Sequence, residues 1–447
     1  MLRSLPRLEI PCSVFEISSI FGWYYEEVPG ADDRGRGTGK KRMKRRSTLA
    51  VGAVLKHFMR VAPHPWIGAK VAALQGDKWL FGFLRNGHHQ DGRAGKIRQV
   101  SFRITDLCNL RCITCGQWGR GGFLHGKSLK DLKQAEVAPD RYVEVLADLV
   151  KNGHRPLVYL WGGEPMLYEG SLQVIEEATA LGLPVSIATN STRVASFADR
   201  FVRAPLFLLQ ISIDGHCAEL HNRVRPAVGG GDNFADIELA LAAVRDARKA
   251  RGKDLPLIAS LTVISKENFH HLSDIYETFR NRVDLFVFYL SWWIDDERAS
   301  AHDRDFSGRF GFSPKLHRGW IADWKPDDFN ALDRQLRGLV ARSRSWSSPP
   351  VALIPGITGV DNLKAYYTRH ECSFGFDRCI SIYQAVEVDS NGDVSPCRDY
   401  HDYVVGNIKD TTLTELWNAP AYRKFRHSLS SCGLMPVCSR CCGLMGY

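Results

Sequence analysis

Three cysteines that could hold an iron–sulfur cluster lie close together in the first quarter of the chain. Cys108, Cys112 and Cys115 form a C-x3-C-x2-C run. A protein usually supplies four thiolates to such a cluster, so three would leave one iron of a cubane [4Fe–4S] cluster open to bind and reduce a ligand. A structural zinc site would need four ligands, and no further Cys or His occurs before His125. The spacing therefore predicts a cluster with an open iron.

A second group of cysteines lies near the C-terminal end, where seven of the 12 follow residue 370. The start of the chain lacks the clean apolar run and small-residue cleavage site of a secretory signal. Clustered cysteines without such a signal indicate metal ligands in a reducing compartment, and we expect a cytoplasmic protein. No uninterrupted apolar stretch of about 18 residues occurs, so no membrane span is expected.

The basic charge of the chain is concentrated at its start. The net charge is +10, and more than half of it lies in residues 1–60. This segment could be an arm for an anionic membrane or nucleic acid, or simply a solvated tail. We expect residues 1–47 to be disordered, because their composition cannot build a core. We expect residues 48–96 to form a helical extension whose basic amphipathic helix packs on its own domain or lies on a membrane.

From residue 99 onwards, strands and helices alternate. Strands are predicted over residues 99–104, 157–161, 185–188, 206–213, 257–264 and 283–290, and helices over residues 139–151, 171–181, 192–202, 233–251 and 266–281. Six such units demand a parallel sheet with helices outside, and barrel enzymes place their chemistry at the C-terminal strand ends. The three-cysteine run directly follows the first strand and would be delivered to that edge.

Three short motifs follow the next strands in turn. They are Gly162-Gly163-Glu164-Pro165, Ala188-Thr189-Asn190-Ser191 and Ser212-Ile213-Asp214-Gly215. Together with the three cysteines, they resemble the motifs of the radical S-adenosylmethionine (SAM) superfamily. The resemblance implies an α/β fold, a partial (β/α)6 TIM-like barrel, over residues 97–290.

The resemblance also implies the ligands of SAM. Cys108, Cys112 and Cys115 would hold the SAM-binding [4Fe–4S] cluster, and the remaining SAM-binding residues would be Gly162, Gly163, Glu164, Pro165, Asn190, Ser212 and Arg225. Glu164 would accept the amino group of SAM, and Arg225 suits its carboxylate because a guanidinium can bind both oxygens. Asn190 could instead be a helix cap.

Two residues near these motifs leave questions open. Thr114 stands where many family members have an aromatic residue against the adenine, so Trp118 or another residue would have to cover the base. Cys217 could donate a hydrogen atom to a substrate radical, or it could be a small buried hydrophobic residue.

The C-terminal residues 371–447 resemble a SPASM/twitch domain, which houses auxiliary clusters. Cys379 and Cys397 flank a turn at Asn391-Gly392, so we expect a hairpin with a cysteine near each end. The predicted ligands of one auxiliary [4Fe–4S] cluster are Cys379, Cys397, Cys438 and Cys441, with zinc as the alternative. Between this domain and the barrel, residues 291–370 form an aromatic-rich insert or linker that could shape a substrate pocket or a small core.

The implied function is that of a radical SAM enzyme. It would cleave SAM reductively to a 5′-deoxyadenosyl radical and abstract hydrogen from a substrate carbon, oxidising or rearranging a small molecule such as a sugar, an alcohol or a lipid-linked compound. One alternative is a maturase that modifies a peptide or protein; another is a non-catalytic metal-binding scaffold with a nucleic-acid-binding arm. The expected partners are the substrate and an electron donor such as flavodoxin or ferredoxin, with peripheral membrane contact possible and nucleic acid not expected.

Overall fold

A computed structural model of the chain describes residues 91–343 and 348–445. The basic segment predicted over residues 1–47 and most of the helical extension predicted over residues 48–96 lie outside the described residues. Within the described ranges, no helix combines the length and the apolar composition needed to cross a membrane.

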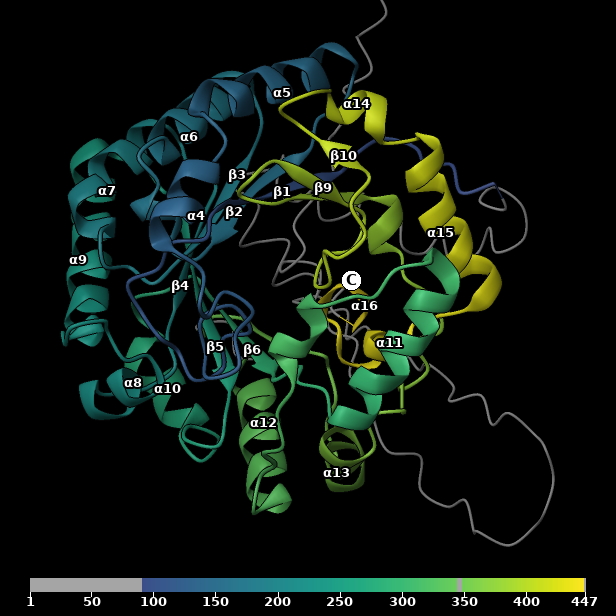
Figure 1. The fold of residues 1–447 in the computed structure, drawn as a ribbon. Helices are drawn as coiled ribbons and strands as arrows, with labels where there is room; N and C mark the ends of the chain where they lie inside the picture. The colour runs from purple at the N-terminus through teal and green to yellow at the C-terminus, as the bar shows by residue number, and fades with distance from the viewer. Residues whose placement is uncertain (1–90, 344–347, 446–447) are drawn as a thin grey trace, which may run out of the picture.

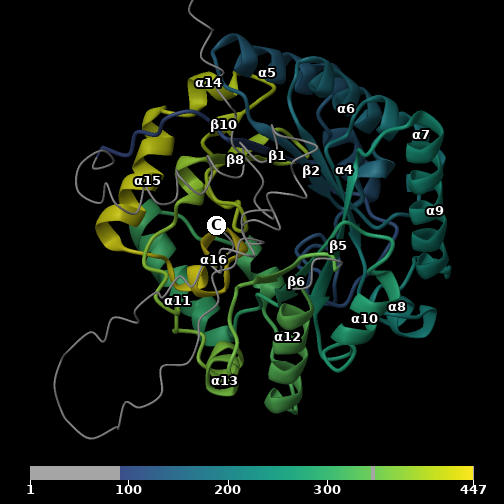
Figure 2. The ribbon, with the colours of Figure 1, turned by 180° about the vertical axis from the view of Figure 1, so that it is seen from behind.

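The six predicted strands form the centre of one parallel sheet (Figures 1 and 2). They are β1 (Gln99–Thr105), β2 (Leu157–Gly162), β3 (Val185–Thr189), β4 (Leu208–Ser212), β5 (Leu257–Ile264) and β6 (Leu285–Leu290). Each pairs in parallel with the next, which confirms the partial barrel.

Strands from the insert, residues 291–370, and from the C-terminal domain, residues 371–447, extend this sheet. β7 (Val351–Ile354) pairs in parallel with β6, and β8 (Ala385–Val388) pairs in parallel with β1. The predicted hairpin joins β8 to β9 (Asp393–Ser395), and β10 (Gly406–Asn407) follows antiparallel to β9. The segment predicted as an insert or linker therefore supplies a strand of the barrel sheet, and the C-terminal domain supplies three more.

The long helices cover the outer face of the sheet (Figure 1). They are α5 (Pro139–Lys151), α6 (Ser171–Ala180), α7 (Val194–Arg203), α9 (Asn233–Arg251) and α10 (Leu272–Phe279). The helix predicted to start at residue 266 starts at Leu272 instead. The side chain of Asn268 accepts a hydrogen bond from the Ser265 amide at 2.8 Å and donates to the Val263 carbonyl at 3.0 Å, so a side-chain turn replaces the first helical turns.

Short elements lie in the loops after the strands, and a second group of helices follows β6 along the chain, in the insert and in the C-terminal domain. The first set comprises α4 (Leu129–Ala135), η1 (Pro165–Leu167) and α8 (Ala218–Val224). The second comprises α11 (Asp296–Phe310), η2 (Leu316–Trp320), α12 (Phe329–Ser343), α13 (Val360–Thr368), η3 (Ser381–Tyr383), α14 (Leu413–Leu416), α15 (Pro420–Cys432), η4 (Pro436–Arg440) and α16 (Cys442–Met445).

The two faces of β1 differ in polarity because successive side chains alternate across a strand. Phe102 packs outward on Tyr142 of α5, with ring centroids 4.7 Å apart. Ser101 and Arg103, one residue to either side, are buried on the other face. Charged and polar groups are thus held inside the barrel, where chemistry can use them.

Aromatic residues of the insert contribute both to a core and to the wall of a cavity, the two roles that the sequence left open. Phe310 of α11 packs on Tyr403 and on Phe425 of α15, with centroids 4.6 and 5.6 Å apart, and so joins the core of the C-terminal domain. Trp292 and Trp320 instead line the cavity at the strand ends.

Candidate active site

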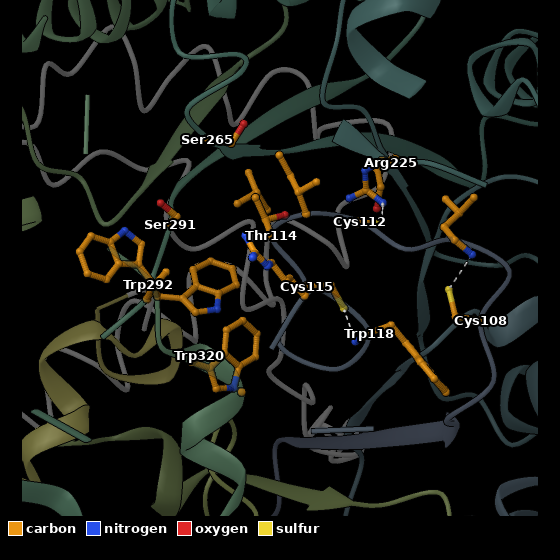
Figure 3. A pocket seen from close by; sticks show the side chains of 18 of the residues that line it. Cys108, Cys112, Thr114, Cys115, Trp118, Arg225, Ser265, Ser291, Trp292 and Trp320 are labelled. Carbon is orange, nitrogen blue, oxygen red and sulfur yellow. Dashed lines mark hydrogen bonds between the residues drawn. The ribbon is translucent and has the colours of Figure 1, made fainter. Parts of the chain in front are cut away.

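A cavity of about 710 Å³ lies at the C-terminal ends of the strands (Figure 3). The ends of β1, β2, β3 and β4 and the segments after them carry the predicted SAM-site residues into it, and it is lined by Cys108, Cys112, Cys115, Gly162, Gly163, Glu164, Asn190, Ser212 and Arg225. Pro165 does not line it; this residue is buried and begins the short helix η1. The fold thus brings together all but one of these residues around one space.

The three thiols of the first loop are suited to a metal cluster. Burial raises the pKa of Cys108 to about 12 and that of Cys112 to about 11. Such thiols would ionise only if positive charge replaced the proton, as iron does. The Leu110 amide lies 3.4 Å from the sulfur of Cys108 and favours its thiolate. The Trp118 amide lies 3.4 Å from the sulfur of Cys115.

The two glycines of the Gly162-Gly163 motif allow the second loop to pack against the cysteine loop. The Gly163 amide donates to the Thr105 carbonyl at 2.8 Å, and the Glu164 amide donates to the Leu107 carbonyl at 2.8 Å. A Cβ atom on Gly163 would lie 2.1 Å from the Leu107 carbonyl oxygen. The absence of a side chain at Gly163 therefore allows this loop to lie directly against the backbone of the cysteine loop.

Glu164 is fixed at the cavity wall by three donors. Its carboxylate accepts hydrogen bonds from the Thr189 hydroxyl at 2.7 Å, the Asn190 amide at 2.7 Å and the Met166 amide at 3.0 Å. Burial raises the pKa of Glu164, while these donors act in the opposite direction by favouring its ionised form. The carboxylate is therefore held in one orientation toward the cavity.

Asn190 forms a turn rather than a helix cap. Its side-chain oxygen accepts from the Thr192 amide at 3.0 Å, and its amide group donates to Asn109 of the cysteine loop at 2.8 Å. The N-cap of α7 is Arg193. The next residue, Ser191, has a φ of 74°, a backbone conformation that favours glycine.

Arg225 is positioned by Asp214, for which the sequence alone indicated no role. Its Nε donates to Asp214 at 2.6 Å, and its Nη1 lies 3.5 Å from the sulfur of Cys112 (Figure 3). The Asp214 side chain is fully buried and also accepts from the Val263 amide at 2.8 Å. The Nε atom of Arg225 is thus occupied by its hydrogen bond to Asp214. This bond holds the guanidinium beside Cys112, on the side of the cavity where the first cluster would lie.

The aromatic cover of this cavity comes from the insert. Trp118 is buried, its indole nitrogen donates to the Asp106 carbonyl at 2.7 Å, and the Arg111 guanidinium stacks 4.3 Å from its ring centroid. Trp320 lies against Gly116, where a Cβ would come within 2.5 Å of its ring. Figure 3 shows Trp292 and Trp320 on the side of the cavity beyond Thr114. The sequence indicated that the aromatic insert could shape a pocket, and Trp320 is one of its aromatic residues that lines the cavity, but its contact with the cysteine loop could not be predicted because only the fold brings the two together.

The four C-terminal cysteines predicted as ligands converge at a second centre. Cys397, Cys438 and Cys441 are buried, and Cys379 is half-buried. Burial raises the pKa of Cys397, and the neighbouring thiols of Cys438 and Cys379 raise it further. The pKa of Cys441 is raised in the same way, with Cys397 and Cys438 among its neighbours. Three buried thiols and one half-buried thiol fit a closed [4Fe–4S] cluster, and the ligand set remains a prediction that this convergence supports.

The other three C-terminal cysteines have different surroundings. Cys372 lies beside Glu371, and Cys432 is exposed. The Cys442 thiol donates to Asp399 at 3.1 Å and lines a smaller inner cavity of about 180 Å³. That cavity is also lined by Ser212, Arg225, Trp292 and Trp320, which line the larger cavity as well. The inner cavity therefore lies between the two cysteine centres.

Buried ion pairs link the two centres across β1 and β8. Arg103 pairs with Asp106 at 2.9 Å and with Asp389 at 3.2 Å, and Asp389 also contacts His401. Burial alone would raise the pKa of Asp389, but the charges of Arg103 and His401 hold it below its usual value. Ser390 donates to Asp106 at 2.9 Å. No motif in the sequence indicates this network, because Asp389 and His401 lie far along the chain from Arg103 and Asp106.

Two protein-family models match the chain, one over the barrel and one over the C-terminal cysteines. The family model described as the Radical SAM superfamily matches residues 102–279, and the one described as an iron–sulfur cluster-binding domain matches residues 379–442. The PqqA peptide cyclase of Rhodopseudomonas palustris is 30% identical over 286 residues, which cover 59% of this chain and 69% of that protein. The AdoMet-dependent heme synthase of Methanosarcina barkeri is 26% identical over 346 residues, covering 76% and 88%.

Solved structures show the same fold. SuiB of Streptococcus suis bound to S-adenosylmethionine superposes with a TM-score of 0.52 at 16% identity, covering 86% of this chain and 82% of SuiB. SuiB bound to its precursor peptide SuiA superposes with a TM-score of 0.51 at 14% identity, covering 84% and 75%.

Proposed function

Since the chain belongs to the radical SAM superfamily and carries an iron–sulfur cluster-binding domain, we propose that it abstracts hydrogen from a carbon atom of a small organic molecule. When bound, the first cluster and SAM together supply a one-electron reduction that yields methionine and a hydrogen-abstracting 5′-deoxyadenosyl radical. We place this reaction in the reducing cytoplasm, where clustered thiols stay free to bind iron.

The residues around the larger cavity have distinct roles in this proposal. Cys108, Cys112 and Cys115 hold the first cluster. Glu164 receives the amino group of SAM, because its carboxylate is held toward the cavity by three donors. Arg225, anchored by Asp214, binds the carboxylate end. The four C-terminal thiols hold the auxiliary cluster.

The inner cavity is the observation that supports a small substrate. Its volume of about 180 Å³ suits a single ring or a short chain, and Trp161, Trp292, Trp320 and Tyr289 are among its walls. Aromatic walls with a few polar groups are typical of small-molecule sites. The position between the two centres also shields a reactive carbon from water.

A second candidate function is the modification of a peptide or protein. It is favoured by the likeness to SuiB, whose structure was solved with a precursor peptide, and by the similarity to a peptide cyclase. In that case the inner cavity would hold one side chain of the peptide.

The experiment measures 5′-deoxyadenosine formed from SAM with dithionite by the reconstituted, oxygen-free full chain. Fractions of a cell extract, one of small molecules and one of peptides, are then added separately. We expect the small-molecule fraction to stimulate the reaction, and Trp292→Ala to weaken that stimulation while SAM cleavage without substrate persists. Stimulation by the peptide fraction alone would favour the second candidate. Absence of cleavage in iron-loaded protein would contradict both.

A further inference from the structure

Cys108 borders two spaces on opposite sides of the cysteine loop. On one side it lines the SAM cavity. On the other it lines an open outer groove of about 780 Å³, together with Leu107, Leu129, Lys130, Lys133, Gln134 and Leu167. The wall between this groove and the first cluster site is therefore as thin as one cysteine side chain.

The outer rim of the groove is the short helix α4, which contributes no residue to the core. None of its residues is buried, and Leu129 is 53% exposed. The helix is nevertheless fixed in place. Ser128 caps its start, Lys133 pairs with Glu169 at 2.7 Å, and Glu136 at its end accepts from Thr105 at 2.5 Å. The groove therefore has an ordered rim that presents the apolar side chain of Leu129 next to its basic residues.

The side chains that α4 presents to the groove are apolar or basic. Lys130, Lys133 and Gln134 share one face because residues three and four apart are neighbours on a helix. Asp131, on the same helix, does not line the groove, and neither does any other carboxylate. Because Lys133 is paired with Glu169, the positive charge that the groove offers to an acidic partner is mainly that of Lys130, next to the apolar side chain of Leu129.

We propose that this groove docks a small acidic protein that carries single electrons, and that its electron enters the first cluster past Cys108. The proposal rests on the proposed function, which requires such a reduction for each cleavage of SAM. The reduced carrier loses one electron and the cluster gains it, so no bond or proton moves in this step. Electron-transfer encounters are typically weak and bury less than about 1,200 Å², so the partner does not need an extensive interface with this face of the protein.

The test compares two reductants on the full reconstituted chain. Flavodoxin, kept reduced by its reductase, is the protein donor, and dithionite is a donor too small to need docking. Lys130→Glu should raise the flavodoxin concentration for half-maximal 5′-deoxyadenosine formation by about five- to tenfold at low salt, because charge complementarity governs such encounters. The difference should shrink as salt is added. The rate with dithionite should not change.

Lys364→Glu, the same charge reversal on an exposed residue of α13, is the matched control and should leave both rates unchanged. Leu129→Ser provides a second variant, which should weaken only the flavodoxin reaction. An equal loss with dithionite would show that α4 shapes the SAM site instead. An unchanged flavodoxin dependence, with lower thermal stability for Leu129→Ser, would show that another part of the chain covers the groove. Either result overturns the proposal. Absence of cleavage by the parent chain with dithionite would instead contradict the proposed function.

Discussion

The two cysteine centres are built in opposite ways. The first takes three thiols from one short loop, keeps them half-buried, and places them at the wall of a large cavity. The second gathers its thiols from distant segments, and three of its four cysteines are buried. Local spacing creates a site with an open position, whereas convergence from distant segments creates a closed one. We therefore expect the first centre to bind a ligand and the second to have a separate role.

The sharpest way to break this comparison is to remove one thiol from each centre. Cys112→Ala should abolish 5′-deoxyadenosine formation, because the open cluster loses one of its three ligands. Cys438→Ala should lose about four irons per chain while retaining some SAM cleavage. Iron content and product are measured on the same samples. Equal activity losses in both variants would mean that the two centres do not have separate roles.

The next largest expected effect is a loss of stability when the buried ion pairs between the two centres are broken. Arg103→Met leaves Asp106 and Asp389 without their shared cation, so the free energy of unfolding should fall by about 3–5 kcal/mol. Denaturant unfolding of the full chain measures it. Arg203→Gln removes an exposed pair with Asp199 and should cost less than about 1 kcal/mol. Similar losses for both variants would show that the two centres are not coupled through Arg103.

The contact between the first two loops can be tested with one methyl group. Gly163→Ala places a Cβ within 2.1 Å of a backbone oxygen, which cannot rotate away. We expect a stability loss of about 1–3 kcal/mol together with weaker SAM binding, measured by equilibrium dialysis. Gly95→Ala is the control, because no heavy atom lies within 4 Å of its Cβ position and Gly95 does not line the cavity. A harmless Gly163→Ala would mean that the loops are free to separate.

The smallest effect concerns Ser191, which is strained at a φ of 74° and whose buried hydroxyl has no hydrogen-bond partner in the described residues. Ser191→Gly should raise the free energy of unfolding by up to about 1 kcal/mol. Ser191→Ala removes the hydroxyl but keeps the backbone strain, and it should gain less. The same unfolding measurement compares them, and a loss in Ser191→Gly would contradict the strain.

The sequence was informative wherever chemistry is encoded locally. The six β/α units and the cysteine loop could be predicted because strand alternation, helix periodicity and motif spacing are short-range signals. The contacts of Arg103 with Asp389, and of Trp320 with Gly116, could not, because they depend on how distant segments meet. The late start of α10 was missed because the side chain of Asn268 competes with the helix backbone.

The pairing of β8 with β1 has a consequence for how the protein is made. β1 leaves the ribosome long before β8, so one edge of β1 keeps its backbone groups unpaired until most of the chain has been synthesised. Unpaired strand edges invite aggregation, and pairings between distant segments form slowly. A chain that is truncated before residue 385 would keep that edge permanently open, and cells would have to shield it with chaperones or degrade it.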